Sequence, residues 1–370
     1  MSGIDLKPLP PKEAIEAFER KGLRASFDWR DMEREEHGRA FTVAGLMKMD
    51  LLQEVRDAMS AAIEEGTTLR EFQQRLTPIL QAGGWWGRQD VVDPQTGEVR
   101  SAQLGSPRRL EIVYDTNLRM AHAAGRWERI EETAAARPWL RYVAVLDGRT
   151  RPLHRAWHGV VLPWDDPWWG AHAPPNGWRC RCSIQQLSDR DLARRGLTPS
   201  EAPGVQTRDW VNGRTGEIRK IPLGVDPGFD YNVGRANMDH QRRTTVEKMD
   251  KVSSDLGRAV ARGFVRSQAF ANFLRSPGAG DFGPPVAMGG GKFGADFSTV
   301  ILSSRLARAL AAEKATLPPE DWLRVQEILD AAPEAALEGR RATLTGADHI
   351  LDLEIDASGR AVVSGFRRKA

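Results

Sequence analysis

The sequence predicts an α+β protein. A helical N-terminal arm leads into a small α+β core, followed by a helical connector and a separate C-terminal α+β domain. Two observations predict this class: apolar residues recur at helical spacing early in the chain, and short apolar runs between turn residues occur later. A third is the Gly- and Pro-rich composition of residues 276–294, which indicates a linker. We therefore expect domains at 1–235 and 295–370, joined by residues 236–294.

Composition and charge exclude several classes of protein. The chain has 370 residues, enough for two or three domains, and 41% of them are hydrophobic. Its net charge of +3 is too small to indicate nucleic-acid binding on charge alone. Two cysteines exclude a disulfide scaffold and suit a reducing cytoplasm. No stretch has the apolar core of a signal peptide or the roughly 20 apolar residues of a membrane span, so we expect a soluble protein made in the cytoplasm.

The first domain begins with a helical arm, residues 1–85. Pro10-Pro11 and Gly22 bound a first helix, and apolar residues at 3.6-type spacing predict a longer one over residues 41–65. Thr68 followed by Glu71 predicts a capping box at the start of the next helix, which ends at Gly83-Gly84.

A core (86–195) and a closing segment (196–235) complete the first domain. In the core we expect a hairpin over residues 90–103, then a long helix from Pro107 to about Ala136. A short strand, 142–146, follows. The closing segment contains a second hairpin, and charged helices fill residues 236–275 of the connector.

The chain's two cysteines stand one residue apart in the core, downstream of two histidines. Thiolate and imidazole groups are good zinc ligands, and four-coordinate sites are the usual structural form. The proposed zinc ligands are His154, His158, Cys180 and Cys182. His172 is a substitute for His158, and Asp147 is an alternative oxygen ligand. The spacing also allows two small residues in a strand beside unrelated histidines.

The same stretch resembles the phage Mu F-like head morphogenesis proteins, which are minor capsid proteins of tailed phages and prophages. The resemblance is carried by Asp147, Arg151, His154, Gly159, Asp165-Asp166-Pro167, Trp169, Pro174-Pro175-Asn176-Gly177-Trp178 and Cys180-Arg181-Cys182. Phe27-Asp28-Trp29, Gly84-Trp85-Trp86-Gly87, Tyr114-Asp115-Thr116-Asn117 and residues 225–234 extend it over roughly residues 8–235. It implies a virion protein that acts in head assembly near the portal and in DNA packaging or ejection. Its implied partners are portal, capsid and scaffold proteins, and phage DNA.

Four polar residues of this domain are expected to have structural roles. Asp147 and Arg151 are predicted to form an ion pair that shapes the histidine-bearing loop. Asp115 and Asn117 fit catalytic or metal-binding roles, but bonds to the loop backbone or to a neighbouring helix account for them better, because buried polar groups are usually satisfied in this way.

The C-terminal domain is expected to place two helices before a small antiparallel sheet. The predicted strands are 297–302, 342–344, 350–355 and 362–366, and the predicted helices are 304–314 and 318–329. Residues 317–322, 328–329 and 363–367 resemble small phage-encoded relatives of the barnase, colicin and RelE ribonuclease fold.

This second resemblance implies an alternative function, a ribonuclease-like effector that the virion carries and that acts on RNA. The candidate catalytic residues are Lys314, His349, Ser364 and Arg367. Residues 286–370 contain 11 Lys and Arg and 12 Asp and Glu, and a nearly neutral domain attracts RNA poorly. The domain can equally be an inactive binding module, so enzymatic activity is an open alternative to a structural role.

Overall fold

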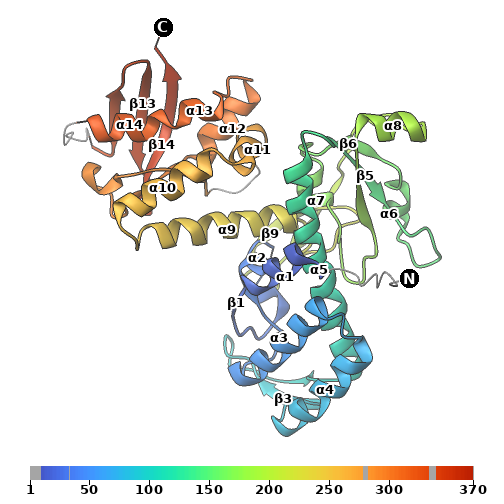
Figure 1. Cartoon of the computed structure of the whole chain (residues 1–370). Coiled ribbons are helices and arrows are strands. Elements are labelled where there is room, and N and C mark those ends of the chain that lie inside the picture. The colour runs from blue at the N-terminus through green and yellow to red at the C-terminus, as the bar shows by residue number, and fades with distance from the viewer. Residues whose placement is uncertain (1–9, 33, 278–281, 333–338, 370) are drawn as a thin grey trace, which may run out of the picture. The chain divides into compact units, whose positions relative to one another are not determined.

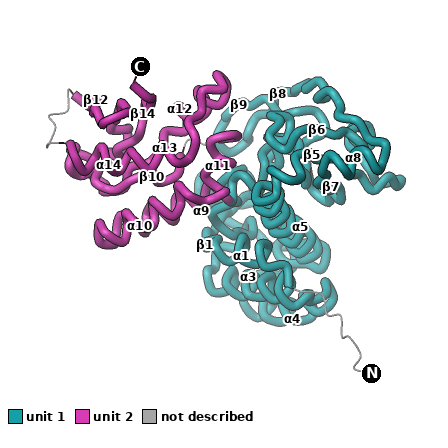
Figure 2. The backbone as a smooth tube through the Cα atoms, turned by 45° about the horizontal axis from the view of Figure 1, so that its top comes forward, with its two compact units in different colours: residues 1–237 teal, residues 238–370 magenta. Residues whose placement is uncertain are grey.

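The computed structural model describes residues 10–32, 34–277, 282–332 and 339–369. The chain divides into two compact units, residues 1–237 (unit 1) and 238–370 (unit 2), which are treated separately below (Figures 1 and 2). Both units combine helices with small sheets, so the predicted α+β class is confirmed.

Four helices of unit 1 share one hydrophobic core. They are α1 (Lys12–Glu19), α3 (Met49–Glu64), α4 (Leu69–Ala82) and α5 (Pro107–Thr133). Their apolar faces bury residues such as Leu52, Leu76 and Leu110 in one cluster. α1 approaches α5 so closely that a Cβ at Gly125 would lie 2.6 Å from the backbone nitrogen of Ala14. A glycine is therefore required at this crossing.

The helix expected over residues 41–65 begins later than predicted, at Met49. The residues before it are irregular, because Ala40–Phe41 (β2) pairs in parallel with Gly22–Leu23 (β1) and Gly45 has a positive φ of 78°. Phe41 is still buried in the same core, so its apolar character reflects tertiary packing and not helix periodicity. The short elements η1 (Trp29–Asp31) and α2 (Glu36–Arg39) also lie in this region.

Local signals placed the next elements of unit 1 correctly. The Thr68 side chain accepts a hydrogen bond from the Glu71 amide, and the Glu71 carboxylate accepts one from the Thr68 amide at 2.8 Å, so the capping box is confirmed. The two predicted hairpins are present. They consist of β3 (Arg88–Val92) with β4 (Val99–Gln103), and β8 (Thr207–Val211) with β9 (Ile218–Pro222).

A three-stranded antiparallel sheet with the order β6-β5-β7 supports the histidine- and cysteine-bearing loops. Its strands and the helices around it are β5 (Trp139–Val143), α6 (Pro152–Ala156), β6 (Val161–Pro163), α7 (Trp169–His172), β7 (Ser183–Leu187) and α8 (Asp189–Arg195). The predicted strand over 142–146 is shifted toward the C-terminus relative to β5. The chain leaves the sheet before Leu146, which has a left-handed φ of 62°.

α9 (Val233–Met249) contains the boundary between the units. Unit 2 has a five-stranded sheet of order β10-β11-β14-β13-β12, with helices that precede the first strand in the chain and helices that connect later strands. Its elements are α10 (Ser254–Val265), α11 (Gln268–Arg275), β10 (Pro285–Met288), η2 (Gly290–Phe293), β11 (Thr299–Leu302), α12 (Ser304–Ala312), α13 (Pro319–Trp322), α14 (Arg324–Ala331), β12 (Arg341–Thr345), β13 (His349–Ile355) and β14 (Ala361–Arg368). Burial alternates along β13, so one face of the sheet packs against the helices (Figure 1).

The Gly- and Pro-rich stretch 276–294, expected to be a linker, contains the edge strand β10, all of whose residues are buried. Pro285 opens this strand, a position that needs no amide hydrogen in the sheet. Val265 and Phe270 from the predicted connector share one core with Val286 and Trp322. Residues 278–281 lie outside the described part of the chain. Separate folding of residues 295–370 remains a prediction.

Candidate metal centre

Two short segments bring the predicted metal ligands of unit 1 together. His154 lies on α6, whose first residue is a proline, and Cys180 and Cys182 lie in the turn that enters β7. The His154 side chain is 2% exposed and Cys180 is 6% exposed, whereas Cys182 is half-buried. The cluster is therefore largely shielded from solvent.

The distances within this cluster suit a single bound ion. His154 Nδ1 lies 3.5 Å from Cys182 Sγ and 3.8 Å from Cys180 Sγ, and the three ligand atoms lie within 4.8 Å of one another. Tetrahedral zinc with bonds of about 2.0–2.3 Å separates nitrogen and sulfur ligands by about 3.5 Å. The three side chains could thus hold one metal ion with little movement.

The second ring nitrogen of His154 is also fixed. Nε2 lies 2.8 Å from the carbonyl oxygen of Gly224, and because a carbonyl can only accept, Nε2 carries the proton and Nδ1 presents its lone pair to the sulfurs. A metal-ligating histidine commonly donates its other N–H to a backbone carbonyl. Gly224 has a positive φ of 88°, and a Cβ there would meet Trp157 at 2.7 Å. Nothing in the sequence marked this glycine as part of the site.

The two thiols influence each other's ionisation. The hydrogen bond between the side chains lowers the pKa of Cys180, with His154 adding to the effect, and raises the pKa of Cys182. Cys180 is therefore the thiol that loses its proton more easily, and the second proton, on Cys182, is harder to remove. A bound divalent cation would remove the second proton, since the thiolate is the form that ligates metal.

The other predicted ligands do not join this cluster. His158 Nδ1 accepts a hydrogen bond from the Ala144 amide at 3.1 Å. His172 stacks on Trp168 with ring centroids 4.4 Å apart, and its Nδ1 lies 3.0 Å from the Trp168 carbonyl oxygen. Within the described ranges, the His/Cys/Asp/Glu group that could hold a metal has three members, His154, Cys180 and Cys182.

The predicted ion pair between Asp147 and Arg151 is wrong. Asp147 pairs with Arg181 at 2.5 Å, and the hydrogen bond from Arg181 holds the pKa of this carboxyl well below its usual range. Arg151 instead pairs with Asp226 at 2.8 Å. Asp226 also accepts a hydrogen bond from the Trp178 amide at 3.0 Å. The cysteine-bearing turn is therefore held by Asp147 through Arg181 and by Asp226 through Trp178.

Asp115 and Asn117 lie on α5. The Asn117 amide donates to the Val113 carbonyl oxygen of the same helix at 2.9 Å. Asp115 lines a cavity of about 290 Å³ together with Cys180 and Cys182. The structural role of Asp115 and Asn117 remains a prediction.

Asn176 belongs to the run that carries the family resemblance, but its role could not be predicted from the sequence. This residue is fully buried, and its Oδ1 accepts a hydrogen bond from the Tyr142 hydroxyl at 2.9 Å. Its carbonyl oxygen accepts from the Asp226 amide at 2.9 Å. The rare Pro-Pro-Asn-Gly run was the available signal, but it carries no information about distant partners.

The four catalytic candidates of unit 2 have separate surroundings among the described residues. The His349 ring stacks on Phe366, and its Nε2 lies 3.3 Å from Asp321 Oδ2. Arg367 is paired with Ile350 in the sheet register, so it projects from the face opposite to His349. The remaining two are Ser364, whose hydroxyl donates to the Asp352 carbonyl oxygen at 3.3 Å, and the exposed Lys314.

The fold and the site define an α+β protein with a buried histidine–dicysteine cluster beside a small sheet. None of the described helices is both long enough and apolar enough to cross a membrane. Residues 53–185 match the family described as "Phage Mu protein F like protein". The "Putative capsid assembly protein F" of Escherichia phage Mu is 36% identical over 361 residues, which cover 90% of this chain and 82% of that protein. The chain belongs to the phage Mu F-like family.

A second relative is the "Mu-like prophage FluMu F protein" of Haemophilus influenzae. It is 34% identical over 270 residues, which cover 68% of this chain and 64% of the relative. No solved structure matches the chain. The predicted family is therefore confirmed, whereas the comparisons do not identify a nuclease-like domain.

Proposed function

We propose that this protein acts in the morphogenesis of a phage head, as a minor component of the virion near the portal. The observation that carries this proposal is the similarity over 90% of the chain to a protein described as a capsid assembly protein. Portal, capsid and scaffold proteins would be its partners, and phage DNA would be contacted during packaging or ejection.

The direct experiment is complementation of a phage that lacks the gene. Wild-type protein should restore heads visible by electron microscopy and should be detected in purified virions. If heads form equally well without the protein, or virions never contain it, the proposal is overturned. Cross-linking in assembling particles would then show whether the portal protein is its neighbour.

We further propose that His154, Cys180 and Cys182 hold one zinc ion as a structural staple. The cluster supports this because two thiolates and an imidazole with a fixed proton match zinc's preferences. The ion would join α6 to the turn before β7, two segments too irregular to form a core alone. His158, the predicted fourth ligand, would need to leave its bond to Ala144, so a water molecule is the simpler fourth ligand.

Unit 2 is proposed to be carried cargo and not a part of the shell. This proposal is supported by the separate hydrophobic core of unit 2, in which residues of α10 and α11 pack with the five-stranded sheet. A deletion test should therefore remove residues 238–370, because removing only 286–370 would expose Val265 and Phe270. Heads that still form would support the cargo proposal, and a loss of heads would contradict it.

Limited proteolysis distinguishes two domain divisions. A linker at 276–294 would release a stable fragment beginning near Phe297. The shared core instead favours a fragment beginning near Met238. Mass spectrometry of the resistant fragment decides between them.

The alternative, a ribonuclease-like effector, remains a prediction of the sequence. The described contacts of Lys314, His349, Ser364 and Arg367 do not bring them together, so no geometric observation favours it. Incubating the full chain with RNA, with His349→Ala as control, would test it.

A further inference from the structure

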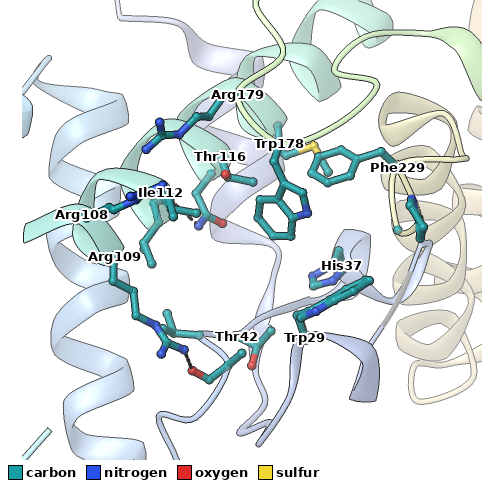
Figure 3. A pocket seen from close by; sticks show the side chains of 18 of the residues that line it. Trp29, His37, Thr42, Arg108, Arg109, Ile112, Thr116, Trp178, Arg179 and Phe229 are labelled. Atoms are coloured by element: carbon teal, nitrogen blue, oxygen red, sulfur yellow. Dashed lines mark hydrogen bonds between the residues drawn. The ribbon is translucent and has the colours of Figure 1, made fainter. Parts of the chain in front are cut away.

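Unit 1 contains a second candidate site, a cavity of about 550 Å³ that shares none of the metal-cluster residues (Figure 3). The first turns of α5 form one side of it, and Trp29, Trp178 and Phe229 lie on the other (Figure 3). Its volume is within the range of about 300–1,000 Å³ that is typical of ligand sites.

Three aromatic rings from distant parts of the chain form one wall. The ring centroids of Trp29 and Trp178 lie 6.4 Å apart, and those of Trp178 and Phe229 lie 5.1 Å apart. Trp178 is 40% exposed although its amide is fixed by Asp226 at 3.0 Å. A large ring held in place but left partly uncovered is a typical anchor for a binding partner.

The remaining apolar lining is aliphatic. It comes from Val43 before α3, and from Ile112, Val113 and Met120 on α5. Such side chains provide an environment for apolar groups of a ligand, not for its phosphates.

The charged lining residues all have the same sign. They are Lys21, Arg108, Arg109 and Arg179, and no aspartate or glutamate lines the cavity. Arg109 donates to the carbonyl oxygens of Gln103 and Ala44, and Arg179 pairs with Glu111 at 3.4 Å.

Lys21 and Arg108 differ from Arg109 and Arg179 in their described contacts. Among the residues that the structure describes, no ion pair involves the side chains of Lys21 or Arg108. Burial lowers the pKa of Lys21 to about 8, which is the effect expected of an ammonium group removed from water without a counter-charge. The cavity is therefore complementary to an anion that also carries apolar groups.

We infer that this cavity binds a short peptide segment of another head protein, one that combines large apolar side chains with a carboxylate. The apolar groups would pack against Trp29 and Trp178, and the carboxylate would meet Lys21 and Arg108. This inference rests on the proposed function only for the source of the peptide. A single-stranded nucleic acid fits less well, because it needs a basic groove that follows several phosphates, and this lining is mostly aliphatic and aromatic.

The experiment is a selection from a randomised heptapeptide library on the purified full-length chain, with a fluorescent thymidine hexanucleotide as a parallel probe. We expect enriched peptides that contain Asp or Glu beside Leu, Ile, Phe or Trp. Enrichment of neutral or basic peptides, or no enrichment, overturns the inference. Hexanucleotide binding that depends on the cavity also overturns it, in favour of nucleic acid.

Three variants locate the binding. Thr116→Trp should fill the cavity and abolish binding of the enriched peptides, and Arg108→Met should weaken it roughly tenfold through loss of a charge-assisted bond. Arg75→Met, an exposed arginine of α4 outside the cavity, is the matched control and should bind as the wild type does. Arg108 is exposed, so its variant keeps the test valid if Thr116→Trp fails to fold. Unchanged binding in Arg108→Met contradicts the inference.

Binding should also depend on pH. His37 is neutral above about pH 4, because burial lowers its pKa to about 4, and the three lining arginines stay charged. Lys21 is then the lining group that loses charge between pH 7 and 9, so affinity for acidic peptides should fall over this range. Lys21→Met should remove the dependence. A flat profile in the wild type would contradict a role of Lys21.

Failure of this inference is distinguishable from failure of the proposed function. Peptide binding is measured on the isolated protein, whereas head formation is measured in the complemented phage. Heads that require the protein while no peptide binds it would overturn the cavity proposal alone.

Discussion

Two buried histidines, His154 in unit 1 and His349 in unit 2, are similarly shielded, at 2% and 6% exposed, but have opposite surroundings. His154 faces two sulfurs with one ring nitrogen and a backbone carbonyl with the other. His349 faces the Asp321 carboxylate, which Arg368 also binds at 2.8 and 3.1 Å. The partners of a histidine, and not its burial, indicate whether a ring nitrogen is free to ligate a metal or already faces a carboxylate.

The largest expected effect is at the metal cluster. Cys180→Ser should abolish zinc binding and lower the free energy of unfolding of unit 1 by several kcal/mol, because the ion joins two loop segments in the folded state only. Elemental analysis and thermal unfolding with and without a chelator provide the measurement. His349→Gln, the control from the other unit, should leave the zinc content unchanged. Zinc retained by Cys180→Ser would contradict the proposed structural zinc site.

At Asp321, the partner of His349, we expect a smaller loss of unfolding free energy. Asp321→Asn should lower the free energy of unfolding of unit 2 by about 1–3 kcal/mol, because it removes hydrogen bonds between charged groups from a site where Asp321 is 13% exposed. Hydrogen exchange of the amides of unit 2 in urea provides the measurement, because eleven of the chain's 12 tryptophans lie in unit 1 and would dominate the fluorescence. A loss as large as that of Cys180→Ser would mean that the ion pair contributes as much as the metal cluster.

Acid should reproduce part of this loss. The hydrogen bond from Arg368 lowers the pKa of Asp321 below its ordinary value of 3.8. The unfolded state then binds more protons than the folded state, so the contribution of Asp321 is fully present above about pH 3.8 and is lost as the pH falls through the folded-state pKa. Urea titrations between pH 6 and 2.5 should show a weaker acid dependence in Asp321→Asn. Equal slopes in both proteins would contradict this assignment.

The smallest effect on the free energy of unfolding is expected at His158. His158→Ala removes one acceptor for the Ala144 amide and should cost about 1 kcal/mol, while zinc content stays the same. If zinc is lost in this variant, His158 is the fourth ligand in the metal-bound protein, as the sequence predicted. Elemental analysis beside His154→Ala separates the two outcomes.

Signals confined to neighbouring residues predicted the structure well. The capping box of Thr68 and Glu71, both hairpins and the long helix that begins at Pro107 all depend on side chains within a few positions of one another. Local signals did not suffice where contacts between distant segments decide the conformation. Phe41 is buried outside the helix, and the buried strand β10 lies in a segment whose composition indicates a linker.

The sequence by itself determined the family and the α+β class, because these follow from rare residue types in a fixed order and from apolar periodicity. It also predicted a cluster of His154, Cys180 and Cys182, but it added His158, which bonds to the Ala144 amide instead. Only the tertiary structure decided which residues pair by hydrogen bonds and ion pairs. Arg151 pairs with Asp226 75 positions away, and His154 bonds to the Gly224 carbonyl 70 positions away. The cavity likewise joins Lys21, Arg108 and Trp178. Contacts at such separations depend on how helices and loops pack, and no periodicity or spacing along the chain encodes them.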